Sequence, residues 1–322
     1  MENNKPKDSF QIECENYYTK CYEINYIRFL NGRDSKAAQT NAERDAQRVT
    51  IKETLKYGLE NFPEIESAAI WNFIYSLHLK RKANLTSLAE LDEEIIAKVI
   101  SADQSWKKAS GHAFEEFIYE TLNPQLKDAE IKFLLQRDIH TMLNNGQINN
   151  DQADIEWLKQ KLHRDVFDLY AVLTYLGNHY VYGCIQSKTS VRDRVSRDRE
   201  PSIEAMEQKF WSIAIVLNGK FLALPKFKEM VNGGGSDYDK NGWHGLYVMS
   251  NKNIGNRIYP TGKNFSLLVS HAKEAAQSWT RARHRFTNTW APTKNNNKNN
   301  MRYVFPKEDQ LKAAEDDLTK KE

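Results

Sequence analysis

The chain has 322 residues, of which 40% are hydrophobic and 28% are charged, as is usual for a globular protein with an apolar core. Its 46 basic and 43 acidic residues nearly balance, which excludes a strong overall charge that would by itself attract a polyanion. Binding to a polyanion would therefore depend on local clusters of charge.

The termini and cysteines indicate the compartment. The first residues, MENNKPKDSF, lack the basic and apolar blocks of a signal peptide, and no apolar run reaches the roughly 20 residues that span a bilayer. The three cysteines have neither the spacing of a zinc site nor that of a disulfide scaffold. We expect a cytoplasmic protein without membrane contact.

The first third of the chain predicts helices. Residues 1–34 are mixed and polar, with an aromatic-rich stretch. Residues 35–101 carry apolar side chains three and four positions apart, and Pro63 and the segment 84–87 interrupt this pattern. We expect an all-helical N-terminal region over residues 1–105.

Strands and helices alternate in the next part, residues 106–287. A helix over 110–122 is expected to end at Asn123-Pro124, and Pro201 is expected to start another. The predicted strands are 129–137, 166–173, 180–188, 212–217 and 245–250, and the predicted helices between and after them are 154–162, 201–211 and 265–283. This alternation predicts an α/β (α+β) domain around one buried sheet. Residues 288–322, with KNNNKNN, are expected to form a flexible polar tail.

Several motifs do not carry a function. DYDKNG at 237–242 begins like a calcium loop, but Val248 stands where the bidentate glutamate should be. Gly262-Lys263 lacks the other residues of a P-loop, and the eight histidines are scattered without a metal-ligand spacing.

Two neighbouring predicted strands carry an acid and a lysine. Asp168 lies near the start of one, while Gln186 and Lys188 lie at the end of the next, on one face because strand side chains alternate. Cleavage of a phosphodiester needs carboxylates that hold Mg²⁺ against the phosphate and benefits from a cation near the attacking water. Asp168 and Lys188 meet this need.

Asp168 with Gln186-Ser187-Lys188 resembles the core of the PD-(D/E)xK nucleases, whose largest group is the type II restriction endonucleases. The resemblance covers roughly residues 106–217 and implies a central mixed sheet flanked by helices, with Mg²⁺ as cofactor. Phe167 stands where the pattern has Pro, and Gln186 where it has an acid. The uncharged Gln186 leaves the second metal ligand open.

The resemblance offers two ways to complete the metal site. Mrr-like nucleases use the glutamine directly. The CCGG-recognising (NgoMIV/EcoRII-like) group moves the carboxylate to the following helix, where this chain has Glu200 and Glu204. We favour Glu204, inside the predicted helix, as the partner of Asp168 in binding the metal.

The residues after Lys188 match the EcoRII-like branch more closely. Two hydroxyl residues, Thr189 and Ser190, precede the triplet Arg192-Asp193-Arg194, as in that branch. An arginine can bind the O6 and N7 atoms of guanine, and a carboxylate can accept from cytosine N4. We expect these five residues to contact DNA, and the alternative is an exposed, salt-bridged turn.

Two further segments are candidates. Gly111, Phe114 and Glu115 fit a helix that in many such enzymes points its glutamate at the metal, which leaves Glu116 facing solvent; surface charge is the alternative. A basic, aromatic segment could track DNA phosphates or could be a solvated helix end. Its residues are Trp279, Arg281, Arg283, Arg285 and Trp290.

The sequence thus predicts a bacterial type II restriction endonuclease that cuts double-stranded DNA with Mg²⁺. We expect a homodimer whose two-fold axis matches a palindromic G/C-containing site, CCGG or an interrupted CC/GG. The N-terminal region would dimerise or clamp the duplex. The alternatives are an Mrr-like modification-dependent or repair nuclease that uses Gln186, and a DNA-binding protein without catalysis.

Overall fold

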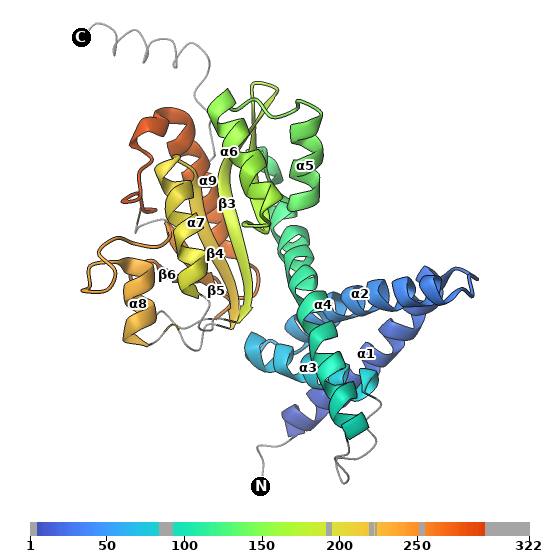
Figure 1. The fold of residues 1–322 in the computed structure, drawn as a ribbon. Helices are drawn as coiled ribbons and strands as arrows, with labels where there is room; N and C mark the ends of the chain where they lie inside the picture. Colours follow the sequence, from blue (N-terminus) through green and yellow to red (C-terminus); the bar gives the residue numbers. More distant parts are fainter. Residues whose placement is uncertain are drawn as a thin grey trace, which may run out of the picture. The chain divides into compact units, whose positions relative to one another are not determined.

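The chain forms two compact units (Figure 1). The computed structural model describes residues 5–83, 93–190, 195–218, 222, 224–250 and 255–293. One unit comprises residues 1–120, 187–191 and 216–220, and the other comprises residues 121–186, 192–215 and 221–322. The expected flexible tail lies outside the described residues from 294 onward.

The first unit is helical, which confirms the prediction of a helical N-terminal region. Its helices are α1 (Lys5–Leu30), α2 (Lys36–Asn61), α3 (Ser67–Lys82) and α4 (Glu93–Leu126), the last of which continues into the second unit. The mixed, polar stretch at the N-terminus forms the long helix α1, and its Tyr17 ring stacks on Tyr57 at 4.2 Å. Trp71 of α3 packs on Trp106 of α4 with the ring centroids 5.1 Å apart.

Helix α4 corrects one prediction. It passes through Asn123-Pro124 and ends at Leu126, so these two residues do not stop it. A proline this close to the end removes only one backbone hydrogen bond. The side chain of Asn123 also fixes the last turn to the sheet, because it accepts from the Phe133 N–H (2.8 Å) and donates to the Phe133 carbonyl (3.0 Å).

The second unit is built on a six-stranded sheet in the order β1-β2-β3-β4-β5-β6. The pairs β1–β2 and β2–β3 are antiparallel, whereas β5–β6 is parallel, so the sheet is mixed as predicted. The five predicted strands are present, and β6 was not foreseen. The strands are β1 (Ile131–Leu135), β2 (Leu169–Tyr175), β3 (Asn178–Ser190), β4 (Trp211–Asn218), β5 (Gly245–Val248) and β6 (Ile258–Pro260).

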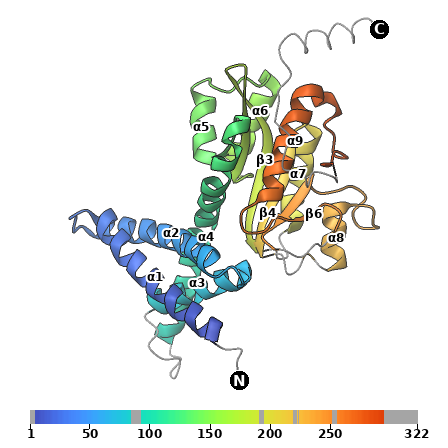
Figure 2. The same ribbon diagram turned by 180° about the vertical axis from the view of Figure 1, so that it is seen from behind.

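Helices cover both faces of the sheet. Figures 1 and 2 show α6 and α7 on one face and α9 on the other. Helices α6 and α9 confirm predictions, α5 and α8 were not foreseen, and α7 begins six residues before Pro201, so that this proline lies inside the helix and does not start it. The helices are α5 (Gln136–Asn144), α6 (Gln152–His163), α7 (Val195–Glu207), α8 (Pro225–Asn232) and α9 (Ser266–Ala282).

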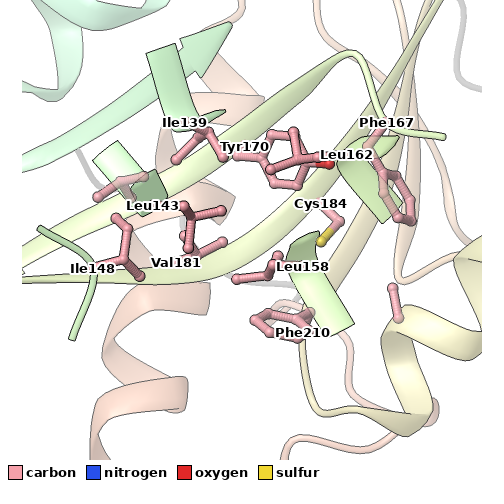
Figure 3. Packing of buried hydrophobic residues seen from close by; sticks show 12 residues of the cluster. Ile139, Leu143, Ile148, Leu158, Leu162, Phe167, Tyr170, Val181, Cys184 and Phe210 are labelled. Atoms are coloured by element: carbon pink, nitrogen blue, oxygen red, sulfur yellow. The ribbon is translucent and has the colours of Figure 1, made fainter. Parts of the chain in front are cut away.

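A β-bulge in β3 determines which of its side chains point to each face of the sheet. The register with β2 shifts between Ala171 and Val172, which makes Tyr182 an extra residue. Val181 and Cys184 therefore both enter the core cluster beneath α6 and α7 (Figure 3). Tyr182 points the other way, and its hydroxyl donates to the Ala272 carbonyl of α9 at 3.1 Å.

Candidate active site

Asp168 lies at the entry to β2. Its N–H donates to the carbonyl of Ile185 on β3 at 2.9 Å, and its side chain is half-buried. Burial raises the pKa of the Tyr170 phenol well above its usual value, and the nearby acidic groups, Asp168 among them, add to the rise. Asp168 lies two residues before Tyr170, which packs in the core beneath α6 and α7, so the alternation of side chains places both residues on that face of the sheet.

Gln186 lies on β3 one residue after the acceptor of the Asp168 N–H. Its side chain is buried, with 1% of the residue exposed. Its Oε1 accepts a hydrogen bond from Trp243 Nε1 at 2.9 Å, and its Nε2 donates to the carbonyl of Asp198 on α7 at 3.0 Å. Both ends of the amide therefore have protein partners.

Lys188 follows on the same strand. Because β3 continues to Ser190, Gln186 and Lys188 lie on one face, as predicted. Lys188 and Thr189 are half-buried. The predicted base-reading triplet Arg192-Asp193-Arg194 and the side chain of Ser190 lie outside the described residues, so their roles stay predictions.

Helix α7 presents both candidate glutamates on its outer side. Glu200 and Glu204 are exposed, whereas Ser202 between them is fully buried and hydrogen-bonds to Ser212 of β4 at 2.7 Å. Glu204 forms an ion pair through its Oε2 with the Nζ of Lys161 on α6. The anion expected to hold a metal thus has a cation beside it.

Glu115 belongs to α4 in the first unit. Its Oε2 lies 3.1 Å from His112 Nδ1, and Phe114, Phe117 and Ile118 on the same helix are buried. The expectation that Glu116 faces solvent is wrong, because its carboxylate pairs with Arg48 of α2 and only 13% of its side chain is exposed.

Among the residues with described side chains, no three His, Cys, Asp or Glu come together as a metal-binding group. Mg²⁺ is commonly held by one or two carboxylates together with water and phosphate oxygens. The half-buried Asp168 and one glutamate of α7 would supply the carboxylates of such a site.

The basic segment at the end of α9 is largely occupied by internal contacts. Trp279 is buried, and its Nε1 donates to the Lys209 carbonyl at 3.0 Å. Arg283 pairs with Asp151 at 3.0 Å and with Asp154 at 2.5 Å. These contacts favour a structural role for Trp279 and Arg283.

Comparison with known proteins identifies the family. Residues 147–285 match the family model described as BsaWI restriction endonuclease type 2. The crystal structure of the pre-specific BsaWI–DNA complex is 45% identical, with a TM-score of 0.62 over 88% of this chain and 99% of that chain. The chain belongs to the BsaWI restriction endonuclease family. It is therefore a type II site-specific deoxyribonuclease, as predicted.

A second solved structure shares the fold of this BsaWI-family enzyme. The specific AgeI–DNA complex is 16% identical, with a TM-score of 0.50 over 79% of this chain and 91% of that chain. No curated protein matches the chain. Within its described residues, this family member has no helix long and apolar enough to cross a membrane.

The part of the chain that matches the BsaWI family model contains Asp168, Gln186, Lys188 and Glu204, whereas Glu115 lies before it. Sequence reasoning missed Lys161 and Trp243 beside these residues. Lys161 left a signal, because it lies between Leu158 and Leu162 on the buried face of α6. Trp243 left none, because it contacts Gln186 only in the folded chain.

Proposed function

We propose that this enzyme cuts both strands of DNA at a palindromic G/C-containing site, CCGG or an interrupted CC/GG, with Mg²⁺ as cofactor. The observation that carries the proposal is the junction of β2 and β3, where the Asp168 N–H bonds to Ile185, three residues before Lys188 on the same strand. A homodimer fits such a site, because its two-fold axis would coincide with that of the DNA.

Asp168 and Glu204 would hold the metal, with Glu115 in support. Bound there, Mg²⁺ would supply a lowered pKa for the attacking water molecule and positive charge beside the leaving oxygen. The Asp168 carboxylate, at the entry to β2, would hold the metal against the scissile phosphate. The Lys188 ammonium holds the attacking water and stabilises the negative charge that grows on the phosphate oxygens.

Base recognition falls to the residues that follow Lys188. Arg192 and Arg194 would each bind a guanine, and Asp193 would accept from cytosine N4, while Thr189 and Ser190 contact the backbone. Because these residues directly follow the strand that carries Lys188, the bases that they contact would lie at a fixed distance from the phosphate that is cut. The N-terminal region, residues 1–105, would serve dimerisation or clamp the duplex.

The test is cleavage of unmethylated phage DNA by the purified protein with Mg²⁺. We expect discrete bands from the wild type, and intact but bound DNA with Lys188→Ala. Lys132→Ala is the matched control, since Lys132 is an exposed lysine on β1 of the same sheet. Cleavage by Lys188→Ala would overturn the site assignment, and a smear from the wild type would overturn site-specific cutting.

The base-reading part needs a separate measurement. Arg192→Ala and Arg194→Ala are each expected to lose about 1–3 kcal/mol of discrimination at one G·C pair. Sequencing of the cut ends from a randomised DNA library would show a relaxed position in the target. Unchanged preference in both variants would place base reading elsewhere in the chain.

A further inference from the structure

Gln186 occupies the position where the nuclease core has an acidic metal ligand, yet its surroundings are those of a structural amide. The residue is 1% exposed, and so is its partner Trp243. The amide oxygen receives the indole N–H, and the amide nitrogen donates to a carbonyl of α7. The side chain thus joins three segments: β3, the start of α7 and the loop before β5.

We propose that Gln186 is a positioning residue, not a metal ligand: it fixes α7, which carries Glu204, against the strand that carries Lys188. The inference rests on the proposed function, because it assumes that these two residues act on one phosphate. If Gln186 does not bind the metal, the second carboxylate ligand comes from α7.

Burial argues against direct metal binding. Mg²⁺ requires near-octahedral coordination and keeps several of its water molecules. Gln186 is enclosed by the indole of Trp243 on one side and the backbone of Asp198 on the other, with almost no surface open to solvent. The amide therefore presents almost no surface to a hydrated cation.

The contacts on α7 show what the amide holds in place. Pro201 has no N–H, so the carbonyl of Arg197 lacks its usual helical donor in this part of the helix. The carbonyl of the next residue, Asp198, receives Gln186 Nε2. Arg199 then donates to the carbonyls of Met230 (3.2 Å) and Lys240 (2.5 Å). The first turns of α7 are therefore held by side chains, and Glu204 follows on the same helix.

A double-mutant cycle tests the inference. Gln186→Met keeps the volume and removes the donor to Asp198, and Trp243→Phe removes the N–H that holds the amide oxygen. Each is expected to slow single-turnover cleavage at saturating Mg²⁺ by about tenfold to a hundredfold, because a small misplacement of a catalytic group has that effect. DNA affinity should stay within about twofold, and the double variant should be no slower than the slower single one.

Trp211→Phe is the matched control. This tryptophan is also fully buried in the second unit, but its Nε1 has no hydrogen-bond partner among the described residues. Its replacement should leave the cleavage rate of the folded protein unchanged. Wild-type cleavage by Trp243→Phe would overturn the inference, because cleavage would then not depend on the hydrogen bond that holds the Gln186 amide.

Gln186→Glu separates the two roles of the amide. A metal ligand that gains a charge binds Mg²⁺ more tightly, so the Mg²⁺ midpoint of cleavage would fall. A positioning residue that loses its donor to Asp198 slows cleavage without lowering the midpoint. A lower midpoint with a retained rate would overturn the inference.

Failure of the proposed function has a different signature. A wild-type protein that cuts no DNA would contradict the proposed function alone. The same cycle, followed by urea unfolding, then tests the link between Gln186 and Trp243: coupled losses of stability support it, and additive losses overturn it.

Discussion

Lys161 of α6 and Glu204 of α7 form an ion pair in which the cation is nearly buried and the anion is half exposed. The side chains are 10% and 50% exposed, and the Lys161 Nζ also lies 5.3 Å from the ring centroid of Trp157. Because Lys161 cannot leave this position easily, a divalent cation that binds Glu204 must do so beside a positive charge.

Lys161→Met is therefore expected to strengthen metal binding. It removes the positive charge but keeps most of the apolar stem, so the Mg²⁺ midpoint of cleavage should fall roughly fivefold. The measurement is the cleavage rate as a function of Mg²⁺ concentration. Lys159→Met, at an exposed position of the same helix, is the control. An unchanged midpoint in Lys161→Met would exclude Glu204 as a metal ligand.

Glu204→Gln and Glu200→Gln decide which glutamate completes the site. Loss of a metal ligand removes several kcal/mol of transition-state stabilisation, so Glu204→Gln should cut about a thousandfold more slowly. Glu200→Gln should cut at nearly the wild-type rate. Both should bind DNA normally in a gel-shift assay. The reverse pattern would assign the metal to Glu200.

Most of the sheet could be predicted from sequence, because its strands are apolar runs bounded by polar turns. The starts and ends of helices around prolines could not. Pro124 and Pro201 each lie inside a helix that a side chain joins to the sheet: Asn123 of α4 bonds to the backbone of Phe133 on β1, and Gln186 of β3 bonds to the backbone of Asp198 on α7. Such contacts depend on the tertiary fold, which a local pattern does not contain.

The places of the candidate residues in the sheet were predictable where strand spacing decides them, and their roles stay predictions. Asp168 lies at the entry to β2, and Gln186 and Lys188 lie on the adjacent strand β3, as their spacing indicates. The role of Gln186 was not predictable, because its partner Trp243 lies 57 residues later in the chain. Glu116 was misjudged for a related reason, since only the packing of α2 on α4 brings Arg48 to it.

Arg283→Met distinguishes a structural arginine from one that binds phosphate. Asp154, its partner, has a side chain that is 4% exposed, so an unpaired carboxylate there should lower the unfolding free energy by about 3 kcal/mol. Urea unfolding measures this loss. The salt dependence of DNA binding should stay unchanged. A reduced salt slope without lost stability would contradict this and assign Arg283 to the DNA.

Two buried histidines of the second unit make stability dependent on pH. Burial lowers the pKa of His244 to about 3 and that of His271 to about 4. His244 accepts from the Ser212 N–H at 3.0 Å and lies 2.8 Å from the Thr287 carbonyl, so the neutral ring fits its site. The unfolded chain binds protons near pH 6.5, whereas the folded chain does not. The stability from the neutral rings is therefore complete above that pH and falls as the pH drops toward 4.

His271→Gln should flatten this fall. Glutamine can still accept from the Tyr247 hydroxyl, which lies 2.8 Å from His271 Nδ1, but it takes up no proton. Between pH 6.5 and pH 5 the variant should lose about 2 kcal/mol less unfolding free energy than the wild type. Urea unfolding at several pH values measures both slopes. His112→Gln is the control, because 69% of the His112 side chain is exposed. Equal slopes in wild type and His271→Gln would show that His271 is already protonated in the folded protein.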